Sequence, residues 1–342
     1  MILTYTQITG NVQNIGRFLT SSVTSSTLLG RFIYWKDGIQ ELLRHPFGLG
    51  YLGYYYREPV IQTAFYSVRF VHNDFLQLGL DIGIVPAILF VASYFKIFSE
   101  KNLSFERKTT LLIMFLHFFM DFDLEFTSMW YLLGLVTYVS EEAQVEDIDH
   151  ANYRKYVMMG IKVFTGICGF FGVYVGSSML PRYLGNAELT STLIPYYTEN
   201  NVEMLSQETD VIKAQNLAEK IYRQNPYIPE TYDVFAVLAF QREDYEKVIK
   251  EKEKSISLQK YNMDAYERYA MLLAKGMNVA AQKGEERNIK ILIEGVKRIP
   301  ELINQVKRHT TELAYKTKDV PDFMLSEATQ KILKEIDKLG AS

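Results

Sequence analysis

Residues 70–95, FVHNDFLQLGLDIGIVPAILFVASYF, place a histidine, His72, directly ahead of a long apolar run. The run covers residues 79–95 and is interrupted only by Asp81 near its start. Its length comes close to the roughly 20 residues that a helix needs to cross the hydrocarbon core of a bilayer. The stretch therefore predicts a membrane-spanning helix with His72 at the membrane surface. A carboxylate inside such a span is costly, so Asp81 marks a functional or structural polar contact.

Three further apolar segments follow. Residues 157–180 approach the same length, whereas residues 109–120 and 126–139 are each short for a full span. The shorter two flank the acidic residues 121–125 and predict a tight hairpin whose acidic tip lies at one membrane face. We therefore expect residues 79–180 to form a transmembrane region of three or four spans.

The distribution of Lys and Arg predicts the orientation of this region, because cytoplasmic loops are enriched in both. Basic side chains cluster in two places, Lys96, Lys101, Arg107 and Lys108 in one loop and Arg154, Lys155 and Lys162 around another. With both loops in the cytoplasm, residues 1–78, the acidic tip and everything after Leu180 are expected outside. The sequence thus predicts a multi-pass protein of the cell membrane, with residues 1–78 and 181–342 extracytoplasmic.

Charge and cysteine content exclude several classes of function. The chain has 342 residues, of which 37 are basic and 40 acidic, a net charge of −3 and no long basic tract, so it lacks the electrostatic footprint of a nucleic-acid-binding protein. Its single cysteine, Cys168, excludes an intrachain disulfide and a zinc site built from several cysteines. The sequence has no HExxH, Walker or GxSxG motif, so we expect neither a metal nor a cofactor.

After Glu199 the pattern changes to amphipathic helices and an internal repeat. Apolar residues line one helix face at Val211, Ala214, Leu217, Ala218, Ile221 and Tyr222. A shift of 34 aligns Tyr232 with Tyr266, Phe235 with Tyr269, Ala236 with Ala270, and Leu238 with Leu272. This is the period of tetratricopeptide helix pairs. We therefore expect residues 181–342 to form a tetratricopeptide-like α-solenoid, which together with the membrane helices makes the chain all-α.

Residues 1–78 hold another helical pattern, which begins near Arg31. Five apolar residues fall on one face of this helix, as in an amphipathic helix at the membrane interface: Phe32, Trp35, Ile39, Leu42 and Leu43. The planar guanidinium of Arg31 matches two oxygens of a phosphate, so it is a candidate for holding the diphosphate of a lipid carrier. The plainer alternative is that Arg31 only anchors the helix to anionic head groups of membrane lipids.

His72 is the candidate proton acceptor, because an imidazole can take a proton from a hydroxyl near neutrality. The alternative is an ordinary solvated loop residue. Asn73 can bind substrate or cap the helix that begins near Phe75. His117 and Asp121 are spaced i, i+4, so we expect them on one helix face within hydrogen-bonding reach, as a catalytic pair or as a packing contact.

Five motifs occur in a fixed order between residues 30 and 139. They are GR at 30–31 followed by Trp35, HPFGLG at 45–50, VHNDFLQ at 71–77, LDIGI at 80–84 and HFFMDFDL at 117–124. In this order they resemble the C-terminal half of the O-antigen ligase and polymerase superfamily, membrane enzymes that act on undecaprenyl-diphosphate-linked glycans outside the cytoplasmic membrane. A tetratricopeptide tail after the last span is similar to family members with an external repeat domain.

The resemblance implies a metal-independent, inverting glycosyl transfer from an undecaprenyl-diphosphate-linked glycan donor to a glycan or protein acceptor. His72 would then be the catalytic histidine that helps to activate the acceptor. Arg31 would be the loop arginine that binds the diphosphate, and Asn73 would support the site.

Four further residues are candidates for binding substrate. Charge and proximity add Arg57 and Arg69, and the motifs add Trp35 and Asp81. Asp81 stands where the family often has glutamate, and Pro86 follows Gly83 where a second glycine is common.

Family members carry several more spans ahead of the catalytic loop. We therefore expect this chain to be the C-terminal part of such an enzyme, as a fragment, a split gene product or a remnant. It would need a separate N-terminal membrane half and lack transferase activity on its own. The rival interpretation is a membrane-tethered tetratricopeptide adaptor without catalysis, whose solenoid recruits partners. Ligase and polymerase use the same donor chemistry, so the sequence leaves that choice, the donor sugar and the acceptor open.

Overall fold

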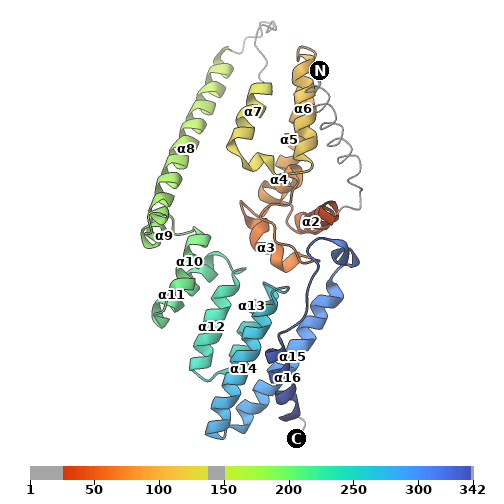
Figure 1. The fold of residues 1–342 in the computed structure, drawn as a ribbon. Coiled ribbons are helices and arrows are strands. Elements are labelled where there is room, and N and C mark those ends of the chain that lie inside the picture. The colour runs from red at the N-terminus through yellow and green to blue at the C-terminus, as the bar shows by residue number, and fades with distance from the viewer. Residues whose placement is uncertain (1–25, 138–150, 340–342) are drawn as a thin grey trace, which may run out of the picture. The chain divides into compact units, whose positions relative to one another are not determined.

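The computed structural model describes residues 26–137 and 151–339 (Figure 1). Every secondary-structure element in these ranges is helical, which confirms the all-α class. The first part of the predicted loop, residues 1–25, and the end of the predicted span at Val139 lie outside the described residues. The chain divides into two compact units. One comprises residues 1–138, 259–267 and 297–330, and the other residues 139–258, 268–296 and 331–342.

The first unit carries the residues of the predicted catalytic loop. Its helices are α2 (Ser26–Arg44), α3 (Gly53–Ile61), α4 (Asp74–Ile82), α5 (Ile84–Phe98), α6 (Phe105–Phe118), the 3-10 turn η1 (Asp123–Glu125), α7 (Thr127–Thr137) and a second 3-10 turn, η2 (Glu312–Lys316). The predicted hairpin thus appears as α6 and α7, with η1 at its acidic tip. Leu111, Met114 and Phe118 of α6 form its buried core with Leu133 of α7 and Tyr94 of α5.

The apolar run 79–95 is not one continuous helix, so that part of the sequence prediction is wrong. Gly83 has φ +98° and ends α4, and α5 starts at the next residue. A Cβ on Gly83 would lie 2.9 Å from the carbonyl carbon of Phe47, so only glycine allows this close approach of two backbones. The Ile84 N–H donates to the Pro46 carbonyl at 2.9 Å, which fixes the break.

Helix α2 covers the predicted amphipathic segment. Unusually, it exposes several apolar side chains and buries two acidic ones. Its apolar residues Phe32, Ile39 and Leu43 are exposed, whereas Asp37 and Glu41 are buried at 1% and 0% exposure. Asp37 accepts hydrogen bonds from the Thr63 N–H and the Tyr66 hydroxyl, both at 2.8 Å. The buried face therefore fastens residues 62–66 to α2 through polar contacts, and the apolar face remains available for a lipid surface.

A segment distant in sequence completes the first unit. After α15 (Glu286–His309) the chain returns to α2. The 3-10 turn η2 lies beside α2 (Figure 1). The Thr311 N–H donates to the Thr63 carbonyl at 2.9 Å. Ala314 is fully buried in one apolar cluster with Ile33 and Tyr66. Residues near position 314 thus belong structurally to the region around α2.

The second unit begins with the long helix α8 (Ala151–Tyr183). Within it, Met158–Tyr183 is the single helix among the described residues that is long and apolar enough to cross a membrane, and Ile84–Phe98 of α5 is a shorter apolar helix. The predicted span 157–180 falls within α8. Within residues 26–137 and 151–339, the structure therefore offers one span by length and composition where the sequence suggested three or four.

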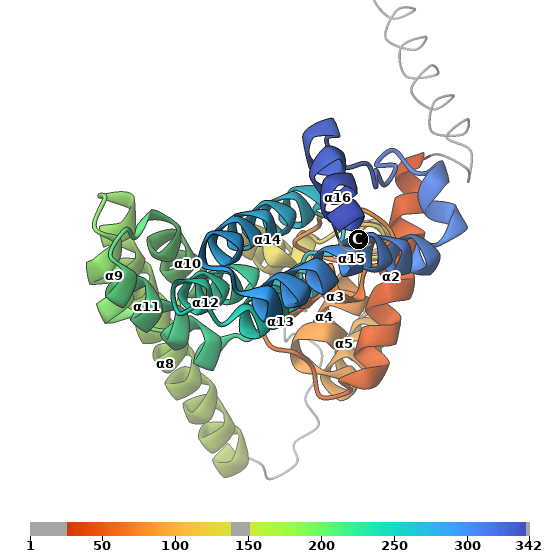
Figure 2. The same cartoon turned by 90° about the horizontal axis from the view of Figure 1, so that it is seen from below.

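The remaining helices follow one another closely along the chain, and the last two of them belong partly to the first unit. They are α9 (Ala187–Leu193), α10 (Thr198–Gln207), α11 (Val211–Gln224), α12 (Pro229–Gln241), α13 (Tyr245–Ser257), α14 (Met263–Lys283) and α16 (Glu327–Leu339). Helix α12 lies between α11 and α13 in both views (Figures 1 and 2).

Two structural details follow the 34-residue spacing of the sequence. Helices α11 and α13 start 34 residues apart, and so do α12 and α14. The Tyr232 hydroxyl donates to the Pro226 carbonyl, and the aligned Tyr266 hydroxyl donates to the Lys260 carbonyl, each at 3.0 Å. These details agree with a duplicated helix pair; the tetratricopeptide-like solenoid stays a prediction.

Candidate active site

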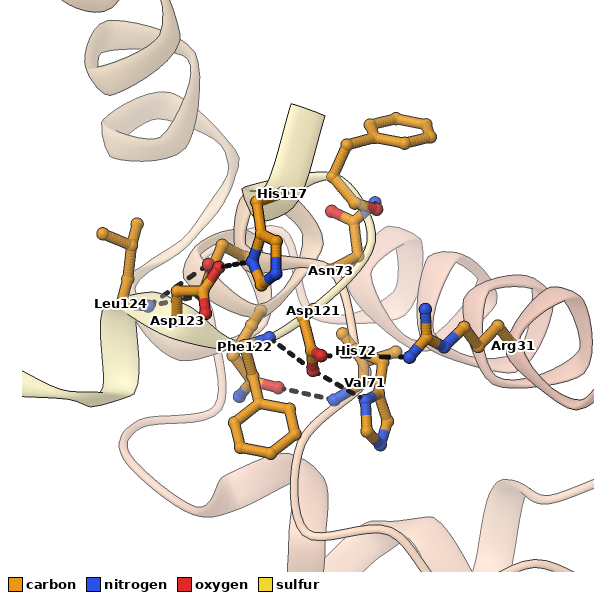
Figure 3. Close-up of polar contacts among 12 residues, drawn as sticks. Arg31, Val71, His72, Asn73, His117, Asp121, Phe122, Asp123 and Leu124 are labelled. Atoms are coloured by element: carbon orange, nitrogen blue, oxygen red, sulfur yellow. Dashed lines mark hydrogen bonds and ion pairs between the residues drawn. The ribbon is translucent and has the colours of Figure 1, made fainter. Parts of the chain in front are cut away.

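His72, Asp121 and Arg31 meet at one place in the first unit (Figure 3). The His72 Nδ1 lies 3.0 Å from Oδ1 of Asp121, and a guanidinium nitrogen of Arg31 lies 3.9 Å from Oδ2 of the same carboxylate. The three side chains are 26%, 35% and 24% exposed. They are therefore held by neighbours and still reachable from outside.

The backbone at His72 is constrained. Its φ of +52° lies in the left-handed region, which is uncommon for a residue other than glycine and often accompanies a functional position. The Trp35 indole donates to the His72 carbonyl at 3.0 Å, and the Val71 N–H donates to the Gln77 side chain at 3.0 Å. Trp35, predicted to bind substrate, thus holds the backbone that carries the imidazole.

Asn73 caps α4, which is one of the two roles that the sequence predicted for it. Its Oδ1 accepts from the Leu76 N–H at 2.9 Å, and its Nδ2 donates to the Phe119 carbonyl at 3.0 Å. Both ends of the amide are engaged, so Asn73 connects the start of α4 to the end of α6.

Asp74 makes a second connection between the same segments. Its carboxylate accepts from the Leu124 N–H at 3.1 and 3.2 Å, and the side chain is 2% exposed. Burial raises the pKa of this carboxyl to about 7. Together, Asn73 and Asp74 fix the turn that presents Asp121 to His72, across 49 residues of sequence.

The expected side-chain pair of His117 and Asp121 is not formed, so this prediction is wrong. Helix α6 ends at Phe118, and the relation survives only in the backbone, where the Asp121 N–H donates to the His117 carbonyl at 2.9 Å. The Asp121 side chain faces His72, and the His117 imidazole pairs with Asp123 instead (Figure 3). Because α6 ends three residues before Asp121, the i, i+4 spacing does not place the two side chains on one helix face.

Arg57 is placed against a buried carboxylate. Its Nε pairs with Glu41, whose side chain is fully buried and which also has the His45 imidazole at 3.3 Å and Arg44 at 3.7 Å. Such a cation offsets the cost of a buried negative charge. The structure thus gives Arg57 a supporting contact within the loop.

Arg69 and Asp81 lie near the site through intermediates. The Arg69 guanidinium lies 6.0 Å from the Phe70 ring centroid, which is 5.3 Å from that of Phe122. Phe122 in turn lies 4.8 Å from the His72 ring. Asp81 accepts from the Gln77 Nε2 at 3.0 Å, and Gln77 holds the backbone next to His72.

The residues that the sequence singled out therefore divide into three groups. His72 and Arg31 come together, Trp35 and Asn73 hold the surrounding backbone, and Arg57 pairs elsewhere. The sequence paired Asp121 with His117, whereas the structure pairs it with His72. Among the described residues, no group of three or more His, Cys, Asp or Glu side chains is arranged to hold a metal ion.

Residues 1–91 of the chain match the family model described as O-antigen ligase. The match covers Arg31, Trp35, His72 and Asn73 and ends before Asp121. The matched residues are a minority of the chain of 342. Neither the curated proteins nor the solved structures include one that matches.

Proposed function

We propose that the first unit forms part of the active site of a membrane glycosyltransferase of the ligase or polymerase type. The observation that carries the proposal is the carboxylate of Asp121 shared between the His72 imidazole and the Arg31 guanidinium. The match of residues 1–91 to the O-antigen ligase family supports it independently. The donor is a glycan linked to undecaprenyl diphosphate, and the acceptor is a hydroxyl of a glycan or an amino-acid side chain.

His72 acts as the general base. An ionised carboxylate only accepts hydrogen bonds, so Asp121 selects the tautomer in which the His72 Nδ1 carries the proton. The Nε2 can then take the proton of the acceptor hydroxyl. Asp121 stabilises the imidazolium that forms, as a carboxylate does in other histidine-based active sites.

Arg31 holds the leaving group. Its ion pair with Asp121 at 3.9 Å engages one nitrogen of a guanidinium that has five N–H donors. A bound diphosphate pairs with these donors and receives charge stabilisation as its bond to the sugar breaks. When Arg31 turns to the diphosphate, His72 is left as the side-chain partner of Asp121, which also accepts from the Phe122 N–H at 3.0 Å, so donor binding prepares the base.

The reaction balances with these groups. The acceptor oxygen attacks the anomeric carbon, and the bond from that carbon to the diphosphate oxygen breaks on the opposite face. The proton of the acceptor moves to the His72 Nε2, and the carrier diphosphate leaves with its negative charge paired to Arg31. The configuration at the anomeric carbon is inverted.

A membrane location fits the apolar surfaces of the chain. In addition to α8, the first unit exposes apolar side chains on α2 and at Phe47, which is 91% exposed. A lipid-linked donor reaches a site with such a border by diffusing within the bilayer. The proposed topology has this surface on the outer leaflet.

The alternative proposal is a tethered adaptor, and one observation favours it. The second unit has a groove of about 480 Å³ among α11, α12 and α13, bordered by the aromatic rings of Tyr222, Tyr232 and Phe235. Such a surface suits a peptide as well as it suits packing against another domain.

Replacing single residues in the native host separates the two proposals. His72→Ala and Arg31→Ala are expected to abolish surface glycan at an unchanged level of the protein, and Tyr222→Ala in the groove to leave it unchanged. The controls are His309→Ala and Arg287→Ala, which remove the same side-chain types at exposed positions. Normal surface glycan in both site variants, with a loss in Tyr222→Ala, would refute the transferase and support the adaptor.

A further inference from the structure

A small pocket in the first unit shares a wall with the His72 site. Its volume is about 80 Å³, and it lies between one side of α2, residues 64–66 and residues 317–319. Tyr34 lines the pocket, and its ring centroid lies 4.6 Å from that of Tyr66, a second lining residue, and 6.1 Å from that of His72. A group in this pocket is thus one aromatic ring away from the proposed base.

Gly30 creates the space in which the Tyr34 hydroxyl lies. A Cβ at position 30 would stand 2.9 Å from that hydroxyl oxygen, closer than real contacts allow. Burial raises the pKa of Tyr34, with Asp319 raising it further and Arg31 lowering it. The hydroxyl therefore lies within the fields of two charges, one from the pocket rim and one from the proposed diphosphate site.

The pocket exists because the distant segment after α15 is docked on α2. The Thr311 N–H bonds to the Thr63 carbonyl, Ala314 is buried against Ile33, and the Tyr261 hydroxyl lies 2.8 Å from that of Thr310. These contacts place the backbone that leads to Thr317, Lys318 and Asp319. Residues 317–319 thus complete a pocket whose other walls belong to the segment matched by the ligase family.

The lining has the chemistry of a sugar-binding subsite. The hydroxyls of Thr27 and Tyr34 can donate to or accept from sugar hydroxyls, and the carboxylate of Asp319 can accept from them. The Thr317 hydroxyl, which donates to the Ala314 carbonyl at 2.8 Å, can accept as well. Phe65 and Tyr66 supply aromatic surface for the C–H face of a ring. Lys318 and Asp319 cancel in charge, so a neutral ligand is favoured over an anion. The volume admits the edge of one ring, with the remainder of the glycan outside.

We propose that this pocket binds one neutral sugar ring of a glycan substrate, with Asp319 accepting hydrogen bonds from its hydroxyls. The proposal rests on the proposed function and deepens it, because it assigns residues of the C-terminal half to substrate recognition. The ring belongs either to the donor glycan or to the acceptor, and these two sources are separated below.

The test uses the full chain in lipid nanodiscs and ligand-observed saturation-transfer NMR with methyl β-D-glucopyranoside and methyl β-D-galactopyranoside. We expect at least one glycoside to bind, and Asp319→Asn to raise its Kd about tenfold, because a hydrogen bond to a charged group is lost. The matched control is Asp322→Asn. It makes the same charge change three residues after Asp319, at a position that does not line the pocket. Absence of binding by both glycosides, or equal Kd values for the two variants, would overturn the proposal.

Geranyl diphosphate, added as a second probe, separates this proposal from the proposed function. Its binding is expected to depend on Arg31 and to be unaffected by Asp319→Asn. Binding that is insensitive to Arg31→Ala counts against the proposed diphosphate site, and the Asp319-dependent binding of the glycoside would still support the pocket. Geranyl diphosphate that carries the same sugar separates the two sources: displacement of the glycoside by this probe but not by geranyl diphosphate assigns the ring to the donor, and displacement by neither assigns it to the acceptor; either result supports a sugar subsite.

Discussion

The imidazole of His72 and the carboxylate of Asp121 lie 3.0 Å apart although 49 residues separate them in sequence. The contact joins a residue with left-handed backbone, His72, to the turn that follows α6. The same carboxylate faces Arg31, so one acidic side chain joins the proposed base to the proposed diphosphate site.

Asp121→Asn is predicted to reduce glycan transfer by about 10²-fold or more, since the amide no longer selects the required tautomer or stabilises the imidazolium. The protein level should be unchanged, because the side chain is 35% exposed. Transfer is measured in membranes of the native host that contain the substituted chain. Asp322→Asn is the control for the charge change, and activity within twofold of the control would contradict the assigned role.

Gly83→Ala is predicted to destabilise the first unit by about 1–3 kcal/mol, because φ is +98° and the new Cβ would meet the backbone of Phe47 at 2.9 Å. Gly134→Ala is the matched control: it lies within α7, and no atom comes within 4 Å of its Cβ. Thermal unfolding of both variants in detergent measures the difference. Equal midpoints would show that the break between α4 and α5 is not required.

Several parts of this arrangement could be predicted from the sequence and others could not. The periodicity predicted the end of α2 near Leu43 but placed its start near Arg31, five residues after the observed start at Ser26. The cap by Asn73 followed from its place ahead of α4. The break at Gly83 left a local signal, a glycine followed by Pro86, but the hydropathy of the run hid it. A positive φ depends on the approach of Phe47, and hydropathy does not report such a contact.

Two longer-range features left no local signal at all. The partner of His72 is Asp121, whereas the i, i+4 spacing pointed to His117, although Asp121 already lies in the predicted hairpin tip, three residues after the end of α6. The docking of residues near Ala314 on Ile33 depends on a contact between segments far apart in the chain. Periodicity and motif order describe neighbours in sequence, so they could not supply either contact.

Arg57→Ala is predicted to destabilise the chain by about 3 kcal/mol or more, because it leaves the buried Glu41 without its main partner. Adding Glu41→Gln should recover much of that loss, since the uncompensated charge is then removed. Unfolding midpoints of the two single variants and the double variant measure the coupling. Arg287→Ala, at an exposed ion pair, is the control and should have little effect. Additive effects at Arg57 and Glu41 would contradict the pairing.

Glu58 is predicted to make stability fall as pH rises. Burial, with the charge of Asp37, raises its pKa from 4.5 to about 8 despite the opposing Lys260. Between these two values the folded chain keeps a proton that the unfolded chain has lost, so the free energy of unfolding decreases with pH and levels off above about 8. Glu58→Gln should flatten this dependence, and the exposed Glu246→Gln should leave it as it is. A fall that is equally steep in Glu58→Gln would contradict the assignment.

The side of the membrane on which residue 72 lies decides whether the proposed base can meet a carrier on the outer leaflet. Cys168 is the only cysteine of the chain, so a Cys168→Ser background with His72→Cys carries a single thiol. Because residue 72 is proposed to lie outside the cytoplasm, a membrane-impermeant maleimide is predicted to label this thiol in intact cells. Labelling that requires permeabilised cells would place residue 72 in the cytoplasm and contradict transfer from a carrier on the outer leaflet.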